Sequence, residues 1–409
     1  MKAQKLLAIT RTLFLLFCLG LFFTDQPVYS QASSSQQPST PLSCADGAQA
    51  SGATYRICMP VQWNGDLIVY AHGYVAPNQP VGIPETQMNL PGTGASVADT
   101  VTAQGYAFAT SGYSVNGLAV KQGIADLIDV VQIFKAQKGT PKRVLLVGVS
   151  EGALITTLAL EQHSDIFSGG LALCGPYGSF TTQTNYFGDF RVLFDYFFPG
   201  LMPGSAIDVP ANLLNTWETA TYSTTVKPVI TDPANAAKVD QLLAVANAAF
   251  DPNNASSKIQ TMKDILWYNV FATNDANVKL GGQPFNNQQR SYTGSADDTT
   301  LNQNVGHFTA DSTALNAIAN GYETTGRLDA PLVVMHTDKD PIVPYQHVDL
   351  YQAKVNAANR AALFAPIKVQ AYGHCQFSSP DIFRAFTQLN SMVSNPPAFP
   401  RAYLPLVVR

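Results

Sequence analysis

Short apolar runs alternate with helical patterns over much of this 409-residue chain. The runs with the length and composition of buried strands are residues 53–63, 66–71, 106–110, 143–147, 167–173, 331–336 and 367–372. Apolar residues spaced by three and four over 117–136 predict an amphipathic helix. Further helices are predicted over 95–104, 151–162, 345–357 and 380–393. This alternation predicts an α/β fold, with a mostly parallel central sheet flanked by helices.

The alternation stops over residues 175–328, which are rich in aromatic residues, Asn and Pro. We therefore predict a long insertion between two strands of the sheet. The core would be divided into a first part, 43–174, and a second part, 329–395. The proline-rich residues 396–409 predict an extended C-terminal tail.

The N-terminal residues have the features of an export signal. Basic residues precede an apolar segment at 12–23 that is short for a bilayer span, and small residues follow near position 30. We interpret residues 1–31 as a signal peptide and 32–42 as a disordered tether; the alternative is an uncleaved anchor. The mature protein is then expected to be secreted or periplasmic, without stable membrane insertion.

The charge content limits the classes of partner. Charged residues are 13% of the chain, and 24 Lys and Arg against 28 Asp and Glu give a formal charge of −4. No basic cluster or stripe is present in the sequence. Nucleic acid is therefore not an expected partner.

Four cysteines remain after the leader, at positions 44, 58, 174 and 375. In an exported protein they predict two disulfides, for which three connectivities exist. Cys44 and Cys58 are close in sequence and are expected to pair. Cys174 and Cys375 can pair only if the fold brings them together.

A serine lies where a predicted strand passes into a helix, in the sequence GVSEG at 148–152. A sharp turn there would expose the Ser150 hydroxyl, and the helix N-terminus would direct the Glu151 N–H at a developing oxyanion. A second strand ends at His72-Gly73-Tyr74, whose Tyr74 N–H is the candidate second donor. The alternative is a turn in which small residues serve packing alone.

A serine nucleophile requires a base and an acid that orients the base. Of six histidines, His374 directly follows the strand predicted at 367–372, and loops at strand carboxyl ends carry the chemistry of parallel sheets. His307 in the insertion is an alternative pocket residue. For the acid we favour Asp340, just beyond the strand at 331–336, over the nearby Asp338.

Together these motifs resemble the α/β-hydrolase superfamily, in which the nucleophile, acid and base follow one another in this order. The resemblance implies the fold of that family, with a cap or lid at the insertion, and is closest to secreted bacterial esterases. His374-Cys375 is similar to tannases and feruloyl esterases, whose cysteines beside the catalytic Ser and His are bridged. Val149 precedes Ser150 here, so that arrangement is absent. We instead hypothesise a disulfide between Cys174, at the end of a neighbouring strand, and Cys375.

Residues 185–198 (NYFGDFRVLFDYFF) contain seven aromatic side chains among 14. They could line an apolar pocket or form the core of the cap. Candidate substrate-binding residues are Phe187, Phe190 and, after another strand, Tyr113. Arg191 could pair with neighbouring acids or meet a substrate carboxylate.

We therefore predict a serine hydrolase that cleaves small-molecule or polymeric carboxylic esters. One alternative is an aminopeptidase with the same fold, in which Asp189, Asp195 or Glu218 would bind the substrate ammonium group. A non-catalytic binding module is another. No cofactor is expected, and no metal site, because the cysteines lack paired ligand spacing and the histidines are scattered.

Overall fold

The computed structural model describes residues 43–91 and 94–396. The predicted leader (1–31), tether (32–42) and nearly all of the predicted tail lie outside these ranges. The described residues belong to one compact unit. The insertion is therefore packed with the core and does not form a separate unit.

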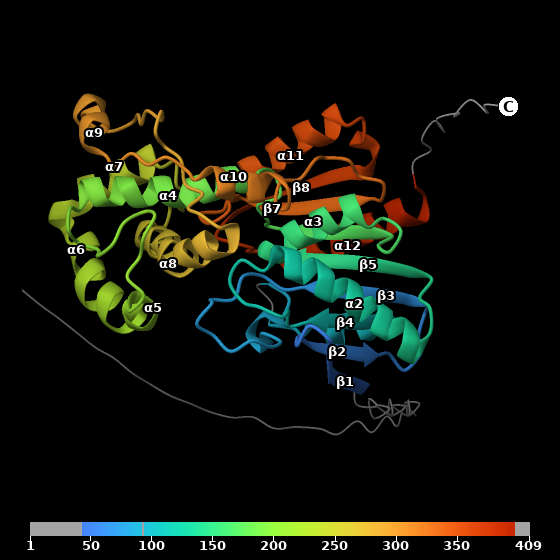
Figure 1. Ribbon diagram of the computed structural model, residues 1–409. Coiled ribbons are helices and arrows are strands. Elements are labelled where there is room, and N and C mark those ends of the chain that lie inside the picture. The colour runs from blue at the N-terminus through green and yellow to red at the C-terminus, as the bar shows by residue number, and fades with distance from the viewer. Residues whose placement is uncertain (1–42, 92–93, 397–409) are drawn as a thin grey trace, which may run out of the picture. The chain divides into compact units, whose positions relative to one another are not determined.

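Eight strands form one sheet in the order β1-β2-β4-β3-β5-β6-β7-β8 (Figure 1). β1 pairs with β2, and β2 with β4, in antiparallel orientation, whereas the remaining neighbours are parallel. The strands are β1 Ser43–Ala48, β2 Thr54–Met59, β3 Asp66–Ala71, β4 Ala107–Ser111, β5 Arg143–Val149, β6 Gly169–Leu173, β7 Leu332–Lys339 and β8 Phe364–Tyr372. Every residue of β3, β4 and β6 is buried, as expected of strands covered on both faces.

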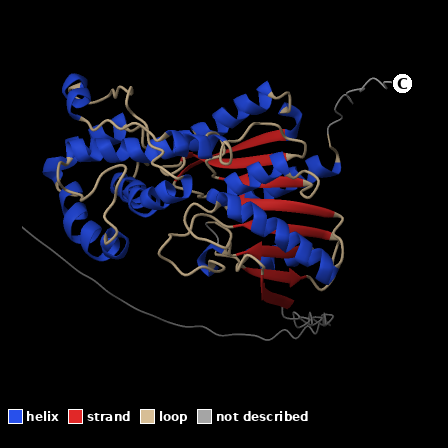
Figure 2. Ribbon diagram, in the orientation of Figure 1, coloured by secondary structure: helices blue, strands red, loops and turns tan. Residues whose placement is uncertain are grey.

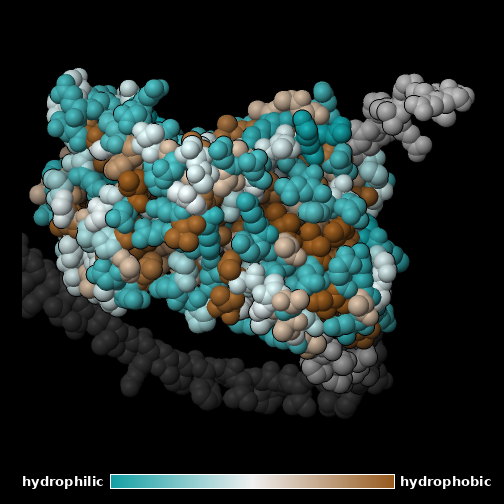
Figure 3. All heavy atoms as spheres, in the orientation of Figure 1, coloured by the Kyte–Doolittle hydropathy of each residue, from teal (hydrophilic) through white to brown (hydrophobic). Residues whose placement is uncertain are grey.

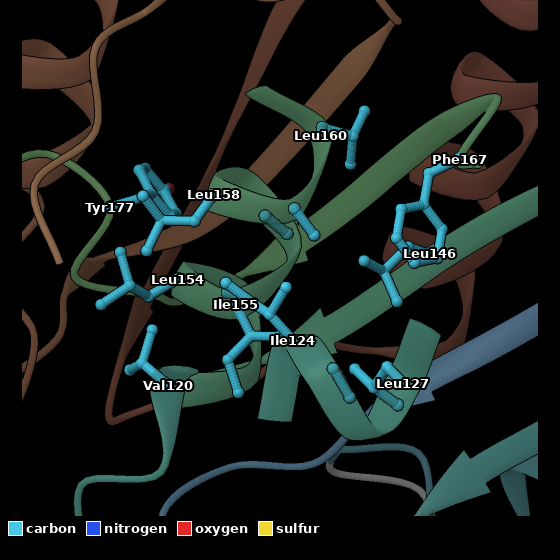
Figure 4. Packing of buried hydrophobic residues seen from close by; sticks show 14 of the residues in the cluster. Val120, Ile124, Leu127, Leu146, Leu154, Ile155, Leu158, Leu160, Phe167 and Tyr177 are labelled. Carbon is cyan, nitrogen blue, oxygen red and sulfur yellow. The ribbon is translucent and has the colours of Figure 1, made fainter. Parts of the chain in front are cut away.

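Helices cover both faces of the sheet. α2 (Val120–Lys138), α3 (Glu151–Gln162) and α11 (Gln346–Ala357) enclose the larger core on one face. Figure 4 shows side chains of α2 and α3 in this core, packed beside Leu146 of β5. α1 (Val97–Thr102) and α12 (Ser379–Ser394) pack on the other face. Short 3₁₀ turns η1 (Glu85–Gln87) and η4 (Ala361–Leu363) lie in connecting segments.

The predicted mostly parallel sheet with flanking helices is confirmed. β1 was not predicted, because its sequence SCADGA has no apolar run; it is an edge strand positioned by pairing with β2. The strand predicted over 53–63 ends at Met59, before the turn at Asn64.

All regular elements described between the end of β6 and the start of β7 are helical (Figure 2). They enclose a hydrophobic cluster of their own, beside the core under the sheet. The elements are α4 Phe180–Phe197, α5 Leu213–Thr216, the π-helical η2 Trp217–Val226, α6 Lys227–Ile230, η3 Pro233–Asn235, α7 Ala236–Val245, α8 Ser256–Leu280, α9 Asp298–Asn304 and α10 Ser312–Ala319. We call residues 174–331 the cap.

Arg191 of α4 is fully buried in the cap and completely paired. Its Nε donates to Asp195 at 2.9 Å, one terminal nitrogen to Asn269 of α8 at 2.7 Å, and the other to the Pro203 carbonyl at 3.1 Å. Arg191 was predicted either to pair with neighbouring acids or to meet a substrate carboxylate. The structure shows the first of these, an ion pair within the cap. The guanidinium joins α4 to α8 and to the loop after α4.

Hydrophobic side chains on the face shown in Figure 3 form small groups among hydrophilic ones. The large exposed hydrophobic residues of the described chain are dispersed: Val61, Val81, Val278, Leu350 and Phe383. No helix in the described part of the chain is both long and apolar enough to cross a bilayer.

Replacement of Arg191 by Met is expected to lower the free energy of unfolding by about 3 kcal/mol, because buried partners lose their donors. Lys258→Met is the matched control, since it breaks the ion pair of Lys258 with Asp240 at the surface of the same cap. That loss should be below about 1 kcal/mol. Urea denaturation of both variants measures the difference, and equal losses would contradict the assigned role of Arg191.

Candidate active site

Ser150 lies on a strained turn between β5 and α3. Its backbone has φ 56° and ψ −119°, which is unfavourable for a residue with a side chain by about 1–3 kcal/mol. The turn requires Gly148 and Gly152: a Cβ on Gly148 would lie 2.0 Å from the Gly152 carbonyl oxygen, and one on Gly152 equally close to the Ala71 carbonyl. The Ser150 N–H donates to the Leu173 carbonyl of β6 at 2.9 Å, which anchors the turn to the sheet. Close packing of the backbone therefore requires glycine at both positions of the GVSEG sequence.

Ser150, His374 and Asp340 form a continuous hydrogen-bonded chain. His374 Nε2 lies 2.9 Å from Ser150 Oγ, and His374 Nδ1 lies 2.8 Å from Asp340 Oδ2. A carboxylate only accepts, so Nδ1 carries the proton and Nε2 is free to accept from the Ser150 hydroxyl. The structure thus brings together the three residues that the sequence singled out, and it places Asp338 elsewhere, accepting from the Ala371 N–H.

The Asp340 carboxylate is buried and held in one orientation. Its Oδ1 accepts the N–H groups of Ile342 and Val343, at 2.9 and 3.0 Å, which leaves Oδ2 for His374. His336, fully buried beneath it, lies 2.8 Å from the Val343 carbonyl through Nε2. Burial lowers the pKa of His336, so this imidazole is neutral and donates from Nε2. His336 therefore fixes the acid loop.

The loop after β3 is clamped by one amide side chain. Gln87 accepts the Gly73 N–H at 2.8 Å and donates to the Tyr74 carbonyl at 3.0 Å. The Tyr74 hydroxyl donates to the Phe271 carbonyl of α8 at 2.9 Å. These bonds hold Tyr74 beside Ser150 and Glu151 in the wall of one cavity. The backbone N–H groups predicted as oxyanion donors thus belong to residues that surround the serine.

The histidine loop is tied to the sheet and to the cap. Both predicted disulfides are present: Cys44–Cys58 joins β1 to β2, and Cys174–Cys375 joins the end of β6 to the residue after His374. The Tyr372 hydroxyl donates to the Ser257 carbonyl at the start of α8.

Cys174, His374 and Cys375 place potential metal ligands within 4.8 Å of one another. Both sulfurs are joined in the disulfide, and both ring nitrogens of His374 are engaged by Ser150 and Asp340. These residues are therefore not available to a metal ion in this state.

An apolar cavity opens at Ser150. We call it the Ser150 cavity. Its wall is formed by the loop after β3, the start of α3 and the facing sides of α4 and α8. The lining residues are Tyr74, Leu118, Ser150, Glu151, Leu154, Pro176, Phe180, Gln183, Thr184, Phe187, Tyr268, Ala272, Ala276, Ile342 and Val343.

Only one of the three predicted substrate-binding residues lines this cavity. Phe187 does so. Phe190 is buried in the core of the cap instead, on another side of α4. Tyr113 is also fully buried, where its ring stacks on His72 at 3.8 Å and its hydroxyl donates to the His72 carbonyl. Tyr113 therefore supports the loop after β3, and its predicted placement in the substrate-binding site is wrong.

Tyr268 of α8 is a site residue that the sequence reasoning missed. Its ring stacks on Phe187 with centroids 4.9 Å apart and an interplanar angle of 4°. Burial raises the pKa of Tyr268, while a hydrogen bond between its phenol and Ser150 lowers it. The available signal was the aromatic spacing of Trp267, Tyr268 and Phe271 within a helical segment. No pattern in the sequence indicated that Gln87 would contact the loop after β3.

The Glu151 side chain is buried at the edge of the Ser150 cavity. One of its oxygens accepts the Ala119 N–H at 2.9 Å. Burial raises the pKa of Glu151 to about 8, and Asp275 adds to the rise, whereas the Ala119 hydrogen bond and Lys279 act against it. At neutral pH this carboxyl is therefore largely uncharged, and the Ser150 cavity stays electrically neutral.

Comparison with known proteins shows the family to which this chain belongs. The sequence description of the α/β hydrolase fold matches residues 87–379, more than half of the chain. The chain belongs to the α/β hydrolase fold family. The predicted fold class is thus confirmed by both the sheet and the family match. Among curated proteins, none matches the sequence.

Solved structures of several α/β hydrolases are similar to this chain. An esterase of Pyrococcus furiosus shares 12% identity, with 87% of this chain and 91% of that chain covered, at a TM-score of 0.44. The acylaminoacyl peptidase of Pyrococcus horikoshii shares 11%, with 87% and 42% covered, at 0.40. Dipeptidyl peptidase 4 of Porphyromonas gingivalis shares 12%, with 87% and 35% covered, at 0.40. The chain spans less than half the length of both peptidases.

The raised pKa of Glu151 predicts a specific dependence of stability on pH. Its pKa rises from 4.5 to about 8 on folding, so only the folded protein keeps this proton between those values. The stability that this proton supplies is complete below about pH 4.5 and is lost as the pH rises toward 8.

Relative to the Glu151→Gln variant, the wild type should therefore lose about 3 kcal/mol of unfolding free energy between pH 5 and 8. Parallel urea denaturation of the two proteins at several pH values measures this difference, and the other titrating groups cancel because both proteins contain them. A difference that stays constant with pH would refute the buried, neutral carboxyl.

Proposed function

We propose that this α/β hydrolase is a secreted serine esterase that cleaves carboxylic esters through an acyl-enzyme on Ser150. The observation that carries the proposal is the hydrogen-bonded chain from Asp340 through His374 to Ser150, opening on an apolar cavity. A chain of this kind activates a serine hydroxyl, because the base removes its proton as the nucleophile attacks. It also argues against a non-catalytic module, which needs no such alignment.

In the proposed reaction, Ser150 Oγ attacks the ester carbonyl carbon while His374 Nε2 takes its proton. Asp340 stabilises the resulting imidazolium through Nδ1–H, and the Tyr74 and Glu151 N–H groups receive the oxyanion. His374 then returns the proton to the departing alcohol. Water, deprotonated by the same nitrogen, attacks the acyl carbon and releases the acid and Ser150.

Two cavities meet at Tyr74, which suggests where each half of the ester binds. The Ser150 cavity is apolar and suits the acyl group. A wider groove open to solvent lies on the other side of Tyr74, lined by Trp267, Phe271 and polar residues such as Gln79 and Asn215. We assign the alcohol portion to this groove, where a small or a polymeric alcohol has room.

The aminopeptidase alternative is disfavoured by the state of its candidate anchors. Asp189 is paired with Arg290 and accepts from the Tyr292 hydroxyl. Asp195 is paired with Arg191, and Glu218 with Lys263 at 2.9 Å. None of the three acids lines the Ser150 cavity, whereas Glu218 lines the neighbouring groove and is paired there. A substrate ammonium group in the apolar Ser150 cavity would therefore meet none of these three carboxylates, an unfavourable transfer from water.

Secretion rests on the leader-like sequence of residues 1–31 and on the two disulfides, which are typical of oxidising compartments.

A fluorophosphonate probe should label the wild type and leave Ser150→Ala unlabelled, since the probe reacts with an activated serine. Ser223→Ala, a substitution at an exposed cap serine, is the matched control and should be labelled fully. Equal labelling of all three proteins would exclude Ser150 as the nucleophile. A parallel panel of p-nitrophenyl esters and aminoacyl anilides tests the substrate class, and cleavage of anilides alone would replace the esterase with a peptidase.

Asp340→Asn should reduce kcat by about 10⁴-fold, because the amide no longer holds His374 in the required tautomer. Asp338→Asn is the control two residues away and should change kcat less than about threefold, since an Asn oxygen at 338 can still accept the Ala371 N–H and Asp338 has no hydrogen bond to His374. Steady-state kinetics on p-nitrophenyl butanoate measures both. If the two variants lost activity equally, Asp340 would not be the orienting acid.

A further inference from the structure

We propose that the Ser150 cavity continues between α4 and α8 as a channel for a linear acyl chain of the length of octanoate or decanoate. This inference rests on the proposed esterase function and adds its acyl specificity. The structural basis is a second apolar cavity beyond the first. We call it the inner chamber.

The two cavities share a common wall. Five residues line both the Ser150 cavity and the inner chamber: Thr184, Phe187, Tyr268, Ala272 and Ala276. Three of these, Thr184, Ala272 and Ala276, have small side chains, so little side-chain bulk separates the two cavities there. The stacked rings of Phe187 and Tyr268 form the remaining side of the junction. An acyl chain bound to Ser150 therefore meets the inner chamber directly behind this aromatic pair.

The helical spacing explains why a channel lies here. The lining residues of α8 are 268, 272, 273, 276 and 277, which fall on one face of the helix. Those of α4 are 180, 183, 184, 187 and 188, again one face. Gly188 allows α4 to approach the chain that follows α8, because a Cβ there would lie 2.3 Å from the Phe285 ring. Two facing stripes with small residues at their centres leave a passage along both helices.

The length of the passage determines which acyl groups it can accommodate. Nine residues separate Tyr268, beside Ser150, from Asn277 at the far end, a distance of about 13 Å along the helix axis. An extended octanoyl or decanoyl group follows such a distance, whereas a butanoyl group stays within the first cavity. The polar side chains of Asn277 and Gln283 border the far end, where an apolar chain gains no further favourable contacts.

The test compares acyl-chain selectivity in Ala276→Phe, which fills the junction, and in Val278→Phe, a control on the exposed side of the same helix. Each buried methylene contributes about fourfold to binding. The wild type and Val278→Phe should therefore prefer p-nitrophenyl decanoate over the butanoate by at least about tenfold in kcat/KM. In Ala276→Phe, kcat/KM on the decanoate should fall by at least about tenfold more than kcat/KM on the butanoate, so that the preference is lost.

Fluorophosphonate labelling shows that each variant is folded and active, and Ala276→Leu is the milder substitute if the Phe variant does not fold. An unchanged decanoate preference in the blocked variant would overturn the channel while leaving the esterase intact. Absence of ester cleavage by the labelled wild type would instead overturn the esterase proposal. A crystal structure of the decylphosphonate adduct on Ser150 gives an independent answer: an alkyl chain outside the α4–α8 passage would contradict the proposal.

Discussion

One face of α8 crosses the carboxyl ends of the strands and bonds to loops around the site. The Ser257 carbonyl receives the hydroxyl of Tyr372 in the histidine loop, and the Phe271 carbonyl receives that of Tyr74. Farther along, Asp275 accepts the Leu118 N–H at 2.7 Å, in the loop after β4. Because these groups share one helix, displacement of α8 would move the segments that carry His374 and Tyr74 together. The cap therefore helps to position both segments.

The sheet was readable from the sequence because its physical demands are local. A buried parallel strand needs a continuous apolar run, and β3, β5 and β6 each carry one. The turn at Ser150 needs glycine at 148 and 152 for steric reasons, so its signature stays within five residues. Asp340 and His374 follow strand ends, where a parallel sheet collects its polar groups on one edge. The grouping of the three residues thus followed from strand order alone.

The remainder of the site depends on contacts between distant segments. Tyr268 lies beside Phe187 because α4 and α8 pack together, and Arg191 of α4 bonds to Asn269, the next residue of α8. Phe187 and Phe190 are equally aromatic and three residues apart, yet one faces the cavity and the other the cap core. The helical phase of α4 decides between them, and that phase is set by its packing partners. Gln87 clamps the loop after β3 from a turn that has no pattern in the sequence.

The distribution of charge gives the cap its chemical character. Two buried or half-buried arginines are paired with acids inside the cap, Arg191 with Asp195 and Arg290 with Asp189. The faces of α4 and α8 that meet Ser150 carry aromatic and small side chains instead. Burial raises the pKa of Glu151 to about 8, so this carboxyl in the cavity wall is largely uncharged at pH 7. For the proposed reaction, apolar surroundings strengthen the field of the Tyr74 and Glu151 N–H groups. The lining that would favour an apolar acyl group would therefore also favour the charge that develops in the proposed attack by Ser150.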